Sequence, residues 1–259
     1  KRTGDKALAV ALDYVRAIKK PGIVVNDTRG FYVNRCVLRY MSEAYKMLIE
    51  GVPAPMIENA ARAAGMPVGP LALTDETAVD LAQKIMKQTI RDLGEKAVDP
   101  AQMQLIDTMV DTHGRFGRKN GKGFYDYPAK PAKKSLWSGL RDLYPQKAAD
   151  DIDYEEIKQR LLVVIALEAV RVMEEGIVTD PREADVGSIL AFGFAPFTGG
   201  ALSYIDSIGA AEFVAIAKRL QKKYGAEFKA PKLLVDMAAK GETFYQRFDP
   251  YAGQANKAA

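Results

Sequence analysis

The 259-residue chain carries 37 basic and 33 acidic side chains, a formal net charge of +4, and 48% of its residues are hydrophobic. This composition is typical of a globular protein with one large or two medium domains. The small basic excess does not indicate nucleic-acid binding, which needs clustered lysine and arginine, but it is compatible with an anionic small molecule. No apolar run approaches the length of a membrane span, and no stretch resembles a signal peptide.

Cysteine and histidine are too scarce for several kinds of site. Cys36 is the only cysteine, which excludes a disulfide framework and a thiolate metal site in this sequence and is typical of a reducing, cytoplasmic compartment. His113 is the only histidine, so we expect no metal site. Its position at a predicted helix end favours a solvated imidazole over a general base.

The first elements look like the end of an α/β domain. Residues 5–20 have apolar side chains at helical spacing, and Pro21-Gly22 separates this helix from a short strand predicted at 23–25. One helix and one strand cannot form a core alone, so we expect the rest of that domain to precede residue 1. The first residue is lysine rather than methionine, which agrees with a missing N-terminal portion.

From Phe31 onward the pattern is helical almost throughout. Helices are predicted at 31–50, 53–64, 75–93, from Pro100, and at 153–175, 181–191, 209–224 and 231–240. Residues 66–70 are expected to form a rigid loop and 128–135 a proline-bearing linker. The small, polar tail after Phe248 is expected to be disordered.

The two helical blocks repeat each other. Positions 125 residues apart share the same residue, namely Arg35 and Arg160, Glu43 and Glu168, Ala44 and Ala169, Gly51 and Gly176, and Glu58 and Glu183. Farther on, the loop before Asp75 parallels the loop before Asp206. We infer an internal duplication of a helical domain. The second copy has Gln159 in place of Asn34 and no evident copy of the 114–125 loop, so a site is expected in the first copy.

Asn34 is the residue whose role the spacing leaves most open. It lies one turn inside the predicted helix, after a sharp turn at Gly30, on a face that also carries Phe31, Val33 and Leu38. A structural amide paired with backbone is favoured by spacing alone, and a side chain that reaches into a site is the alternative.

The segment 114–125 combines four glycines with four cations and ends in two aromatic residues. It lacks the Gly-Lys-Ser/Thr ending and the preceding strand of a phosphate loop. Arg118 or Lys119 could still contact an anionic cofactor or an acyl-carrier phosphate. A solvated basic turn is equally compatible with the sequence.

Three segments in order, 21–35, 65–70 and 114–125, closely resemble the 3-hydroxyacyl-CoA dehydrogenase family. The duplication resembles its multifunctional members, which also carry enoyl-CoA hydratase activity. The resemblance implies a mainly α fold with two duplicated helical domains of the 6-phosphogluconate-dehydrogenase C-terminal type, preceded by a helix–strand remnant of an NAD-binding Rossmann domain. The implied boundaries are 1–27 for the remnant, 28–128 and 153–248 for the helical domains, 129–152 for the linker and 249–259 for the tail.

The resemblance also implies an activity, the NAD-dependent oxidation of 3-hydroxyacyl-CoA to 3-ketoacyl-CoA in fatty-acid β-oxidation. Asn34 matches the asparagine that hydrogen-bonds the substrate and the catalytic histidine, and Lys119 matches a lysine near the cofactor. The catalytic His–Glu pair and the dinucleotide motif would lie upstream, so we expect this piece alone to be inactive. His113 does not match the catalytic position, and Leu190 stands near the position of a substrate-contacting tyrosine.

The partners implied are 3-hydroxyacyl-CoA, upstream Rossmann and hydratase domains of the same chain, a second copy in a homodimer, and a thiolase subunit. No nucleic acid is expected. Two other functions remain open at this point. One is a non-catalytic helical module for self-association, with Asn34 buried in the core, and the other is a dehydrogenase of the same layout for another hydroxy acid.

Overall fold

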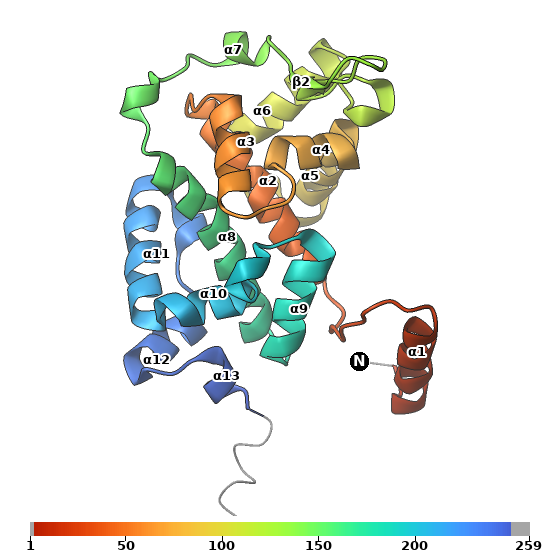
Figure 1. The fold of residues 1–259 in the computed structure, drawn as a ribbon, viewed down its shortest axis with the longest axis vertical. Helices are drawn as coiled ribbons and strands as arrows, with labels where there is room; N and C mark the ends of the chain where they lie inside the picture. Colours follow the sequence, from red (N-terminus) through yellow and green to blue (C-terminus); the bar gives the residue numbers. More distant parts are fainter. Residues whose placement is uncertain (1–2, 250–259) are drawn as a thin grey trace, which may run out of the picture. The chain divides into compact units, whose positions relative to one another are not determined.

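The computed structural model describes residues 3–249, and helices make up most of that range (Figure 1). The elements up to Asn120 are α1 (Asp5–Ala17), α2 (Val33–Ile49), α3 (Ala54–Ala63), α4 (Pro70–Thr77), α5 (Val79–Leu93), the 3-10 turn η1 (Glu95–Ala97), α6 (Pro100–Asp107), the π-helical turn η2 (Thr108–Thr112) and the 3-10 turn η3 (Arg118–Asn120). Two short strands, β1 (Tyr125–Asp126) and β2 (Ser135–Leu136), then pair antiparallel.

The remaining elements are again helical. They are α7 (Leu140–Leu143), η4 (Ala149–Asp151), α8 (Tyr154–Glu174), α9 (Pro181–Phe192), η5 (Pro196–Thr198), α10 (Ala201–Ile208), α11 (Ala210–Tyr224), η6 (Ala226–Phe228), α12 (Lys232–Lys240) and α13 (Phe244–Arg247). Residues 250–259 of the predicted tail lie outside the described residues. Among residues 3–249, every helix is too short or too polar to cross a lipid bilayer.

The chain forms two compact units whose boundaries fall inside helices. One, the discontinuous unit, combines Lys1–Val37 with Val163–Ala259, and the other, the continuous unit, is Leu38–Leu162. Helices α2 and α8 therefore each begin in one unit and end in the other. The boundaries predicted at 28–128 and 153–248 follow the sequence repeats instead.

The long helix α8 supplies the most buried segment of the chain. All ten residues from Leu161 to Val170 are buried, and nine of them are apolar. A helix that is apolar all round is stable only in an interior. The exception is Glu168, only 2% of whose surface is exposed, and whose charge therefore needs a buried partner.

The two repeats predicted from the sequence appear as the same succession of elements. The order α2, α3, α4, α5, η1, α6 recurs as α8, α9, α10, α11, η6, α12, with one additional turn, η5, between α9 and α10. Helices α4 and α10 are both eight residues long, and α5 and α11 are both fifteen. The order and the lengths of the helices therefore support the internal duplication.

In each repeat a buried acid caps the third helix and accepts a tyrosine hydroxyl. In the first repeat this acid is Glu58, which accepts from the Leu71 N–H at 2.8 Å and the Tyr125 hydroxyl at 2.7 Å. In the second repeat it is Asp185, which accepts from the N–H of Leu202 at 2.7 Å and the hydroxyl of Tyr245 at 3.0 Å. The sequence match of Glu58 to Glu183 was therefore wrong, because α9 is displaced by two residues from the constant spacing.

A second carboxylate in each repeat holds the segment that ends in Phe-Tyr. The carboxylate of Asp75 accepts from the N–H groups of Phe124 and Tyr125, both at 2.8 Å. The carboxylate of Asp206 accepts from the N–H of Phe244 at 3.0 Å. Residues 241–245 are thus a shortened copy of the end of the glycine-rich loop, which the sequence comparison missed.

Two predicted elements differ from the structure. Residues 23–25 form no strand, because no neighbouring strand lies beside them, and the backbone here bonds instead through Asn26 to the Ile177 carbonyl. The helix predicted at 75–93 is two helices, since α4 begins at Pro70 and the chain breaks at Ala78, where φ is +81°. An alanine gives no sequence signal for such a break.

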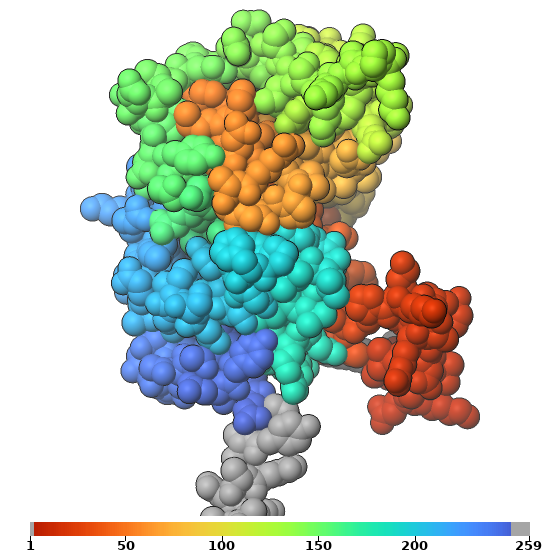
Figure 2. All heavy atoms as spheres, in the orientation of Figure 1, coloured from red at the N-terminus to blue at the C-terminus, as the bar shows by residue number. Residues whose placement is uncertain are grey.

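The N-terminal helix α1 contributes nothing to the core. None of its thirteen residues is buried, and Val10 and Tyr14 are 61% and 66% exposed. Figure 2 shows the surface of this segment in red. Its apolar side chains would be buried only by a partner that is not among the described residues.

The break at Ala78 yields a test of backbone strain. Its φ of +81° with ψ of 125° is a conformation that glycine adopts at much lower cost, and the second repeat has Gly209 at this joint. We expect Ala78→Gly to raise the free energy of unfolding by about 1 kcal/mol, because strain relief exceeds the loss of one methyl group. Urea denaturation measures this. The matched change Gly209→Ala should destabilise by a similar amount, and a destabilised A78G variant would refute the strain argument.

Asp75 predicts a pH dependence of stability. Burial raises its pKa from 3.8 to about 6, against the opposing effect of its hydrogen-bond donors. Between these values the folded state binds more protons than the unfolded state. The stabilisation that Asp75 adds to the free energy of unfolding is therefore fully present below pH 4 and is lost as the pH rises through 6. Asp75→Asn should therefore flatten the fall in unfolding free energy between pH 4 and 6.

Urea unfolding at several pH values measures this slope. Asp142→Asn, at an exposed position, is the control and should leave the slope as in the wild type. If D75N and wild type show the same slope, the buried Asp75 carboxyl does not titrate in this range.

Candidate functional site

The turn that leads into α2, residues 26–32, is held by hydrogen bonds at both of its ends. The backbone N–H of Asn26 donates to the carbonyl of Ile177 at 2.8 Å, and its side-chain amide donates to that of Gly176 at 2.7 Å. At the other end, the Tyr32 hydroxyl donates to the Ala184 carbonyl in α9 over 3.0 Å. The turn is therefore fixed to the chain on both sides of the α8–α9 loop.

Within the turn, two consecutive residues have positive φ. Gly30 has φ of 78° and Phe31 has φ of 49°. This conformation puts Tyr32 into the interior and leaves the Phe31 side chain 48% exposed. A bulky residue in the left-handed region costs about 1–2 kcal/mol, and such strain persists where surrounding contacts hold it. The contacts at the two ends of the turn do so here.

Asn34 is the second residue of α2, and its side chain is exposed. It makes no hydrogen bond to any of residues 3–249, which excludes the interpretation of a buried amide paired with backbone. The backbone N–H groups of Val33 and Asn34 also find no acceptor in that range. A helix N-terminus carries a partial positive charge, so these donors together suit an oxygen atom that bears negative charge.

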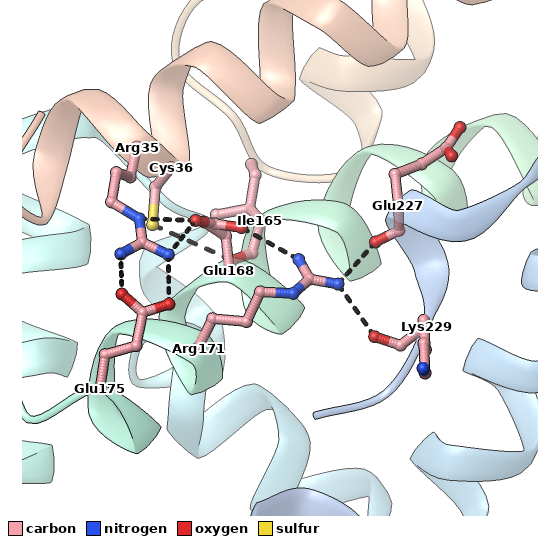
Figure 3. Close-up of polar contacts among 8 residues, drawn as sticks. All are labelled: Arg35, Cys36, Ile165, Glu168, Arg171, Glu175, Glu227 and Lys229. Carbon is pink, nitrogen blue, oxygen red and sulfur yellow. Dashed lines mark hydrogen bonds and ion pairs between the residues drawn. The ribbon is translucent and has the colours of Figure 1, made fainter. Parts of the chain in front are cut away.

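The next residue, Arg35, is bonded to Glu168 of α8 and to Glu175, which directly follows α8 (Figure 3). Its Nε donates to Glu168 Oε1 at 2.7 Å, and its two terminal nitrogens donate to the two oxygens of Glu175 at 2.5 and 3.0 Å. The hydrogen bonds that Arg35 donates to Glu175, together with the charge of Glu168, raise the pKa of Arg35 above its ordinary value, although burial opposes them. The guanidinium is thus a fixed cation.

A second arginine holds the other oxygen of Glu168. Arg171 donates to Glu168 Oε2 at 3.0 Å and to the backbone carbonyls of Glu227 and Lys229 at 2.8 and 2.9 Å (Figure 3). Both oxygens of the buried Glu168 carboxylate are therefore paired. We call Arg35, Glu168, Arg171 and Glu175 the Arg35 cluster.

The other repeat has a counterpart of this arrangement. Arg160, near the start of α8, donates to Glu43 at 2.6 Å and to the two oxygens of Glu50 at 2.7 and 3.2 Å. The residue before it is Gln159, where the first repeat has Asn34. Arg160, Glu43 and Glu50 form the Arg160 cluster, which belongs entirely to the continuous unit.

The glycine-rich loop is docked on α4 rather than free in solvent. A side chain at Gly123 would collide with the Asp75 carboxylate, and one at Gly117 would come within 2.6 Å of the Asp75 backbone oxygen. Arg115 is buried and donates to the carbonyls of Gly123 and Tyr125. Two of the four glycines thus have a packing role.

Two cations of this loop are paired with carboxylates. The Lys119 ammonium lies 2.5 Å from Asp80, and the Arg118 guanidinium donates to Glu76 at 2.6 Å. Hydrogen bonds and the charge of Lys119 lower the pKa of Asp80, although partial burial opposes them. The Lys119 side chain is 49% exposed, so an anion can approach it but must compete with Asp80.

His113 is exposed, and its ring packs edge-on against Trp137 with 4.8 Å between centroids. Trp137 also stacks on the guanidinium of Arg115. No group of three or more metal-ligating side chains occurs within residues 3–249.

A cavity of about 530 Å³ lies in the continuous unit between α5 and α6. Its lining consists of Ile90, Glu95, Val98, Pro100, Met103, Gln104, Asp107, Thr108, Asp111 and Thr112. Neither Asn34 nor Lys119 lines this cavity.

The partners of Arg35 were not predicted from the sequence. The sequence does contain a sign of these partners, because Glu50 and Glu175 are separated by the same 125 positions as Arg35 and Arg160. The repeat shows that these side chains recur together, but which arginine meets which glutamate depends on the packing of α2 on α8.

Comparison with known proteins shows what this chain is similar to. Residues 30–127 match the model of the family described as "3-hydroxyacyl-CoA dehydrogenase, C-terminal domain". The fatty acid oxidation complex subunit alpha of Shewanella amazonensis is 41% identical over 246 residues, which cover 94% of this chain and 34% of that protein. The chain thus spans about a third of the length of this curated relative.

Two solved structures share the fold. The crystal structure of 3-hydroxybutyryl-CoA dehydrogenase from Escherichia coli superposes with a TM-score of 0.70 at 21% identity, over 92% of this chain and 66% of that one. The dehydrogenase part of multifunctional enzyme 1 from C. elegans gives a TM-score of 0.64 at 20% identity, over 89% and 53% of the two chains. Residues 30–127 thus match the C-terminal domain of the 3-hydroxyacyl-CoA dehydrogenase family, and the chain shares its fold with the two solved structures.

Proposed function

We propose that this chain is the C-terminal, substrate-side part of an NAD-dependent 3-hydroxyacyl-CoA dehydrogenase of fatty-acid β-oxidation. The reaction would convert the 3-hydroxyl group of a 3-hydroxyacyl-CoA to a ketone. The observation that carries the proposal is Asn34, an exposed amide without a hydrogen-bond partner in residues 3–249, inside the domain that matches the family.

In this proposal the Asn34 amide donates a hydrogen bond to the reacting oxygen of the substrate. Negative charge grows on that oxygen when the hydroxyl loses its proton and before the carbonyl is complete. The free N–H groups of Val33 and Asn34, at the N-terminus of α2, favour the same charge. Donors that are already oriented stabilise the transition state without reorganisation, which is why they act on kcat.

The family implies dependence on NAD, which accepts the hydride when it is bound. Of this chain's residues, we propose Lys119 as a contact for the negatively charged groups of the cofactor. Its half-exposed ammonium fits such a role, and Asp80 holds it in place until the anion arrives. No described residue is assigned as the general base, since His113 packs on Trp137.

The proposal extends to the assembly. The curated relative is named as the alpha subunit of a fatty acid oxidation complex. By analogy we place this protein in the cytoplasm, with Rossmann and hydratase domains in the same chain, as a homodimer that binds a thiolase subunit. The uncovered apolar face of α1 is compatible with a neighbouring domain or partner.

A non-catalytic self-association module would leave Asn34 in the core, and its exposure argues against that alternative. A dehydrogenase for another hydroxy acid would use the same Asn34 geometry. Assaying several hydroxy acids and their CoA thioesters with the full-length protein distinguishes these substrates.

Asn34→Ala tests the proposed role directly. We expect kcat for 3-hydroxyacyl-CoA oxidation by the full-length protein to fall about 10²–10³-fold, the usual effect of removing one oriented donor. Gln159→Ala, the same truncation in the second repeat, is the matched control and should leave kcat within about twofold. Wild-type kcat in the N34A variant would refute the role of Asn34.

Lys119→Ala tests the cofactor contact. We expect the KM for NAD to rise about tenfold, because one charge-assisted contact contributes on the order of 1.4 kcal/mol. Arg118→Ala removes a neighbouring cation that is paired with Glu76 and serves as the control. Equal KM values for the two variants would show that only the net charge of the loop matters.

A further inference from the structure

The side chain next to Asn34 is the most extensively held group at the start of α2. Arg35 makes three hydrogen bonds, at 2.5 to 3.0 Å, to the carboxylates of Glu168 in α8 and of Glu175 just after it. Asn34 itself has no such restraint within residues 3–249. The direction in which its side chain leaves the helix is therefore set by the backbone of the first turn of α2.

We propose that Arg35 is a positioning residue for Asn34. By joining the first turn of α2 to Glu168 and Glu175, it fixes the direction in which the Asn34 amide points. This inference rests on the proposed role of Asn34 in the reaction.

The first turn of α2 needs such a restraint. The first turn of any helix lacks half of its backbone hydrogen bonds and frays readily. Here the preceding Phe31 is also strained, with φ of 49°, and the first intrahelical bond runs from the Cys36 N–H to the Tyr32 carbonyl. Unwinding the turn would relieve that strain, and the ion pairs of Arg35 oppose it.

The two carboxylates that bind Arg35, Glu168 and Glu175, are themselves held in place. Glu168 is 2% exposed, and its second oxygen is taken by Arg171, which also binds the carbonyls of Glu227 and Lys229 (Figure 3). Glu175 presents both oxygens to the Arg35 guanidinium, a two-point contact that defines angle as well as distance. The start of α2 is thus tied to a network that reaches the segment before α12.

The duplication supplies a matched control for this network. Arg160 makes the same pattern of contacts to Glu43 and Glu50, at 2.6 to 3.2 Å. The residue before it is Gln159, to which we assign no role in the reaction. Loss of an ion pair should affect stability in both clusters, but it should affect the reaction only in the Arg35 cluster.

The experiment compares Glu175→Gln with Glu50→Gln in the full-length protein. Each change keeps the side-chain size and removes the outer carboxylate of one cluster. We expect both variants to have a lower Tm. We expect E175Q to lower kcat about tenfold with the KM for acyl-CoA within about twofold, because misplacing a group costs transition-state contacts. E50Q should keep kcat within about twofold of the wild type.

A double-mutant cycle separates positioning from general destabilisation. If Glu175 and Arg35 act through Asn34, E175Q has no further effect on kcat in the N34A background. A purely structural role predicts the same tenfold loss in both backgrounds, and that result would overturn the inference. Arg35→Lys keeps the charge but not the two-point contact, so it should lower kcat in the wild-type background only.

The failures of the two proposals are distinguishable. Wild-type kcat in N34A removes the basis of the proposed function and of this inference together. Impaired N34A with E175Q equal to E50Q overturns the positioning role of Arg35 and leaves the role of Asn34 standing.

Discussion

Two arginines tie the start of one long helix to the end of another, and the placement of α2 and α8 depends on them. Arg35 at the start of α2 binds Glu168 and Glu175, and Arg160 near the start of α8 binds Glu43 and Glu50. The side chains of Glu168, Arg160 and Glu43 are at most 3% exposed. Burial of such charges is unfavourable unless each is paired, and loss of one buried partner costs about 3–5 kcal/mol. A shift of either helix by one residue would break every one of these contacts. The register of α2 and α8 is therefore determined by charge pairing as well as by apolar packing.

Much of the fold could be predicted, because long helices with apolar spacing and glycine ends carry strong local signals. Helix α8 and helices α9, α11 and α12 lie within two residues of their predicted bounds. Short elements whose stability comes from tertiary contacts could not be predicted. Helix α10 was missed, since its N-terminus is capped by Asp185 from another helix. The match of Glu58 to Glu183 failed because equivalent residues of the two repeats hold the same position within their helices, not a constant spacing in the sequence. Glu58 is the fifth residue of α3, and Asp185 is the fifth residue of α9.

The candidate site was harder to predict than the fold. Spacing placed Asn34 on an apolar face and favoured a buried amide, whereas Phe31 and Leu38 of that face are 48% and 38% exposed. An exposed apolar face looks like a core face in a sequence, because periodicity does not tell which side meets solvent. The change to Gln159 in the second copy weakened that interpretation, and the family resemblance then pointed to Asn34 as a site residue. The partners of Arg35 could not be assigned from the sequence, since several glutamates recur at the same spacing.

The duplication also explains why only one copy has a candidate site. Helix α8 is preceded by Asp153, whose carboxylate accepts the Glu156 N–H at 3.0 Å, and its first turn carries Glu155 and Glu156. These carboxylates neutralise the partial positive charge of that helix end and would repel an anionic oxygen. The first turn of α2 has no acidic residue, and the N–H groups of Val33 and Asn34 have no acceptor among residues 3–249. The same helix, anchored by the same type of arginine cluster, is thus open to a negatively charged group in one repeat and closed to it in the other.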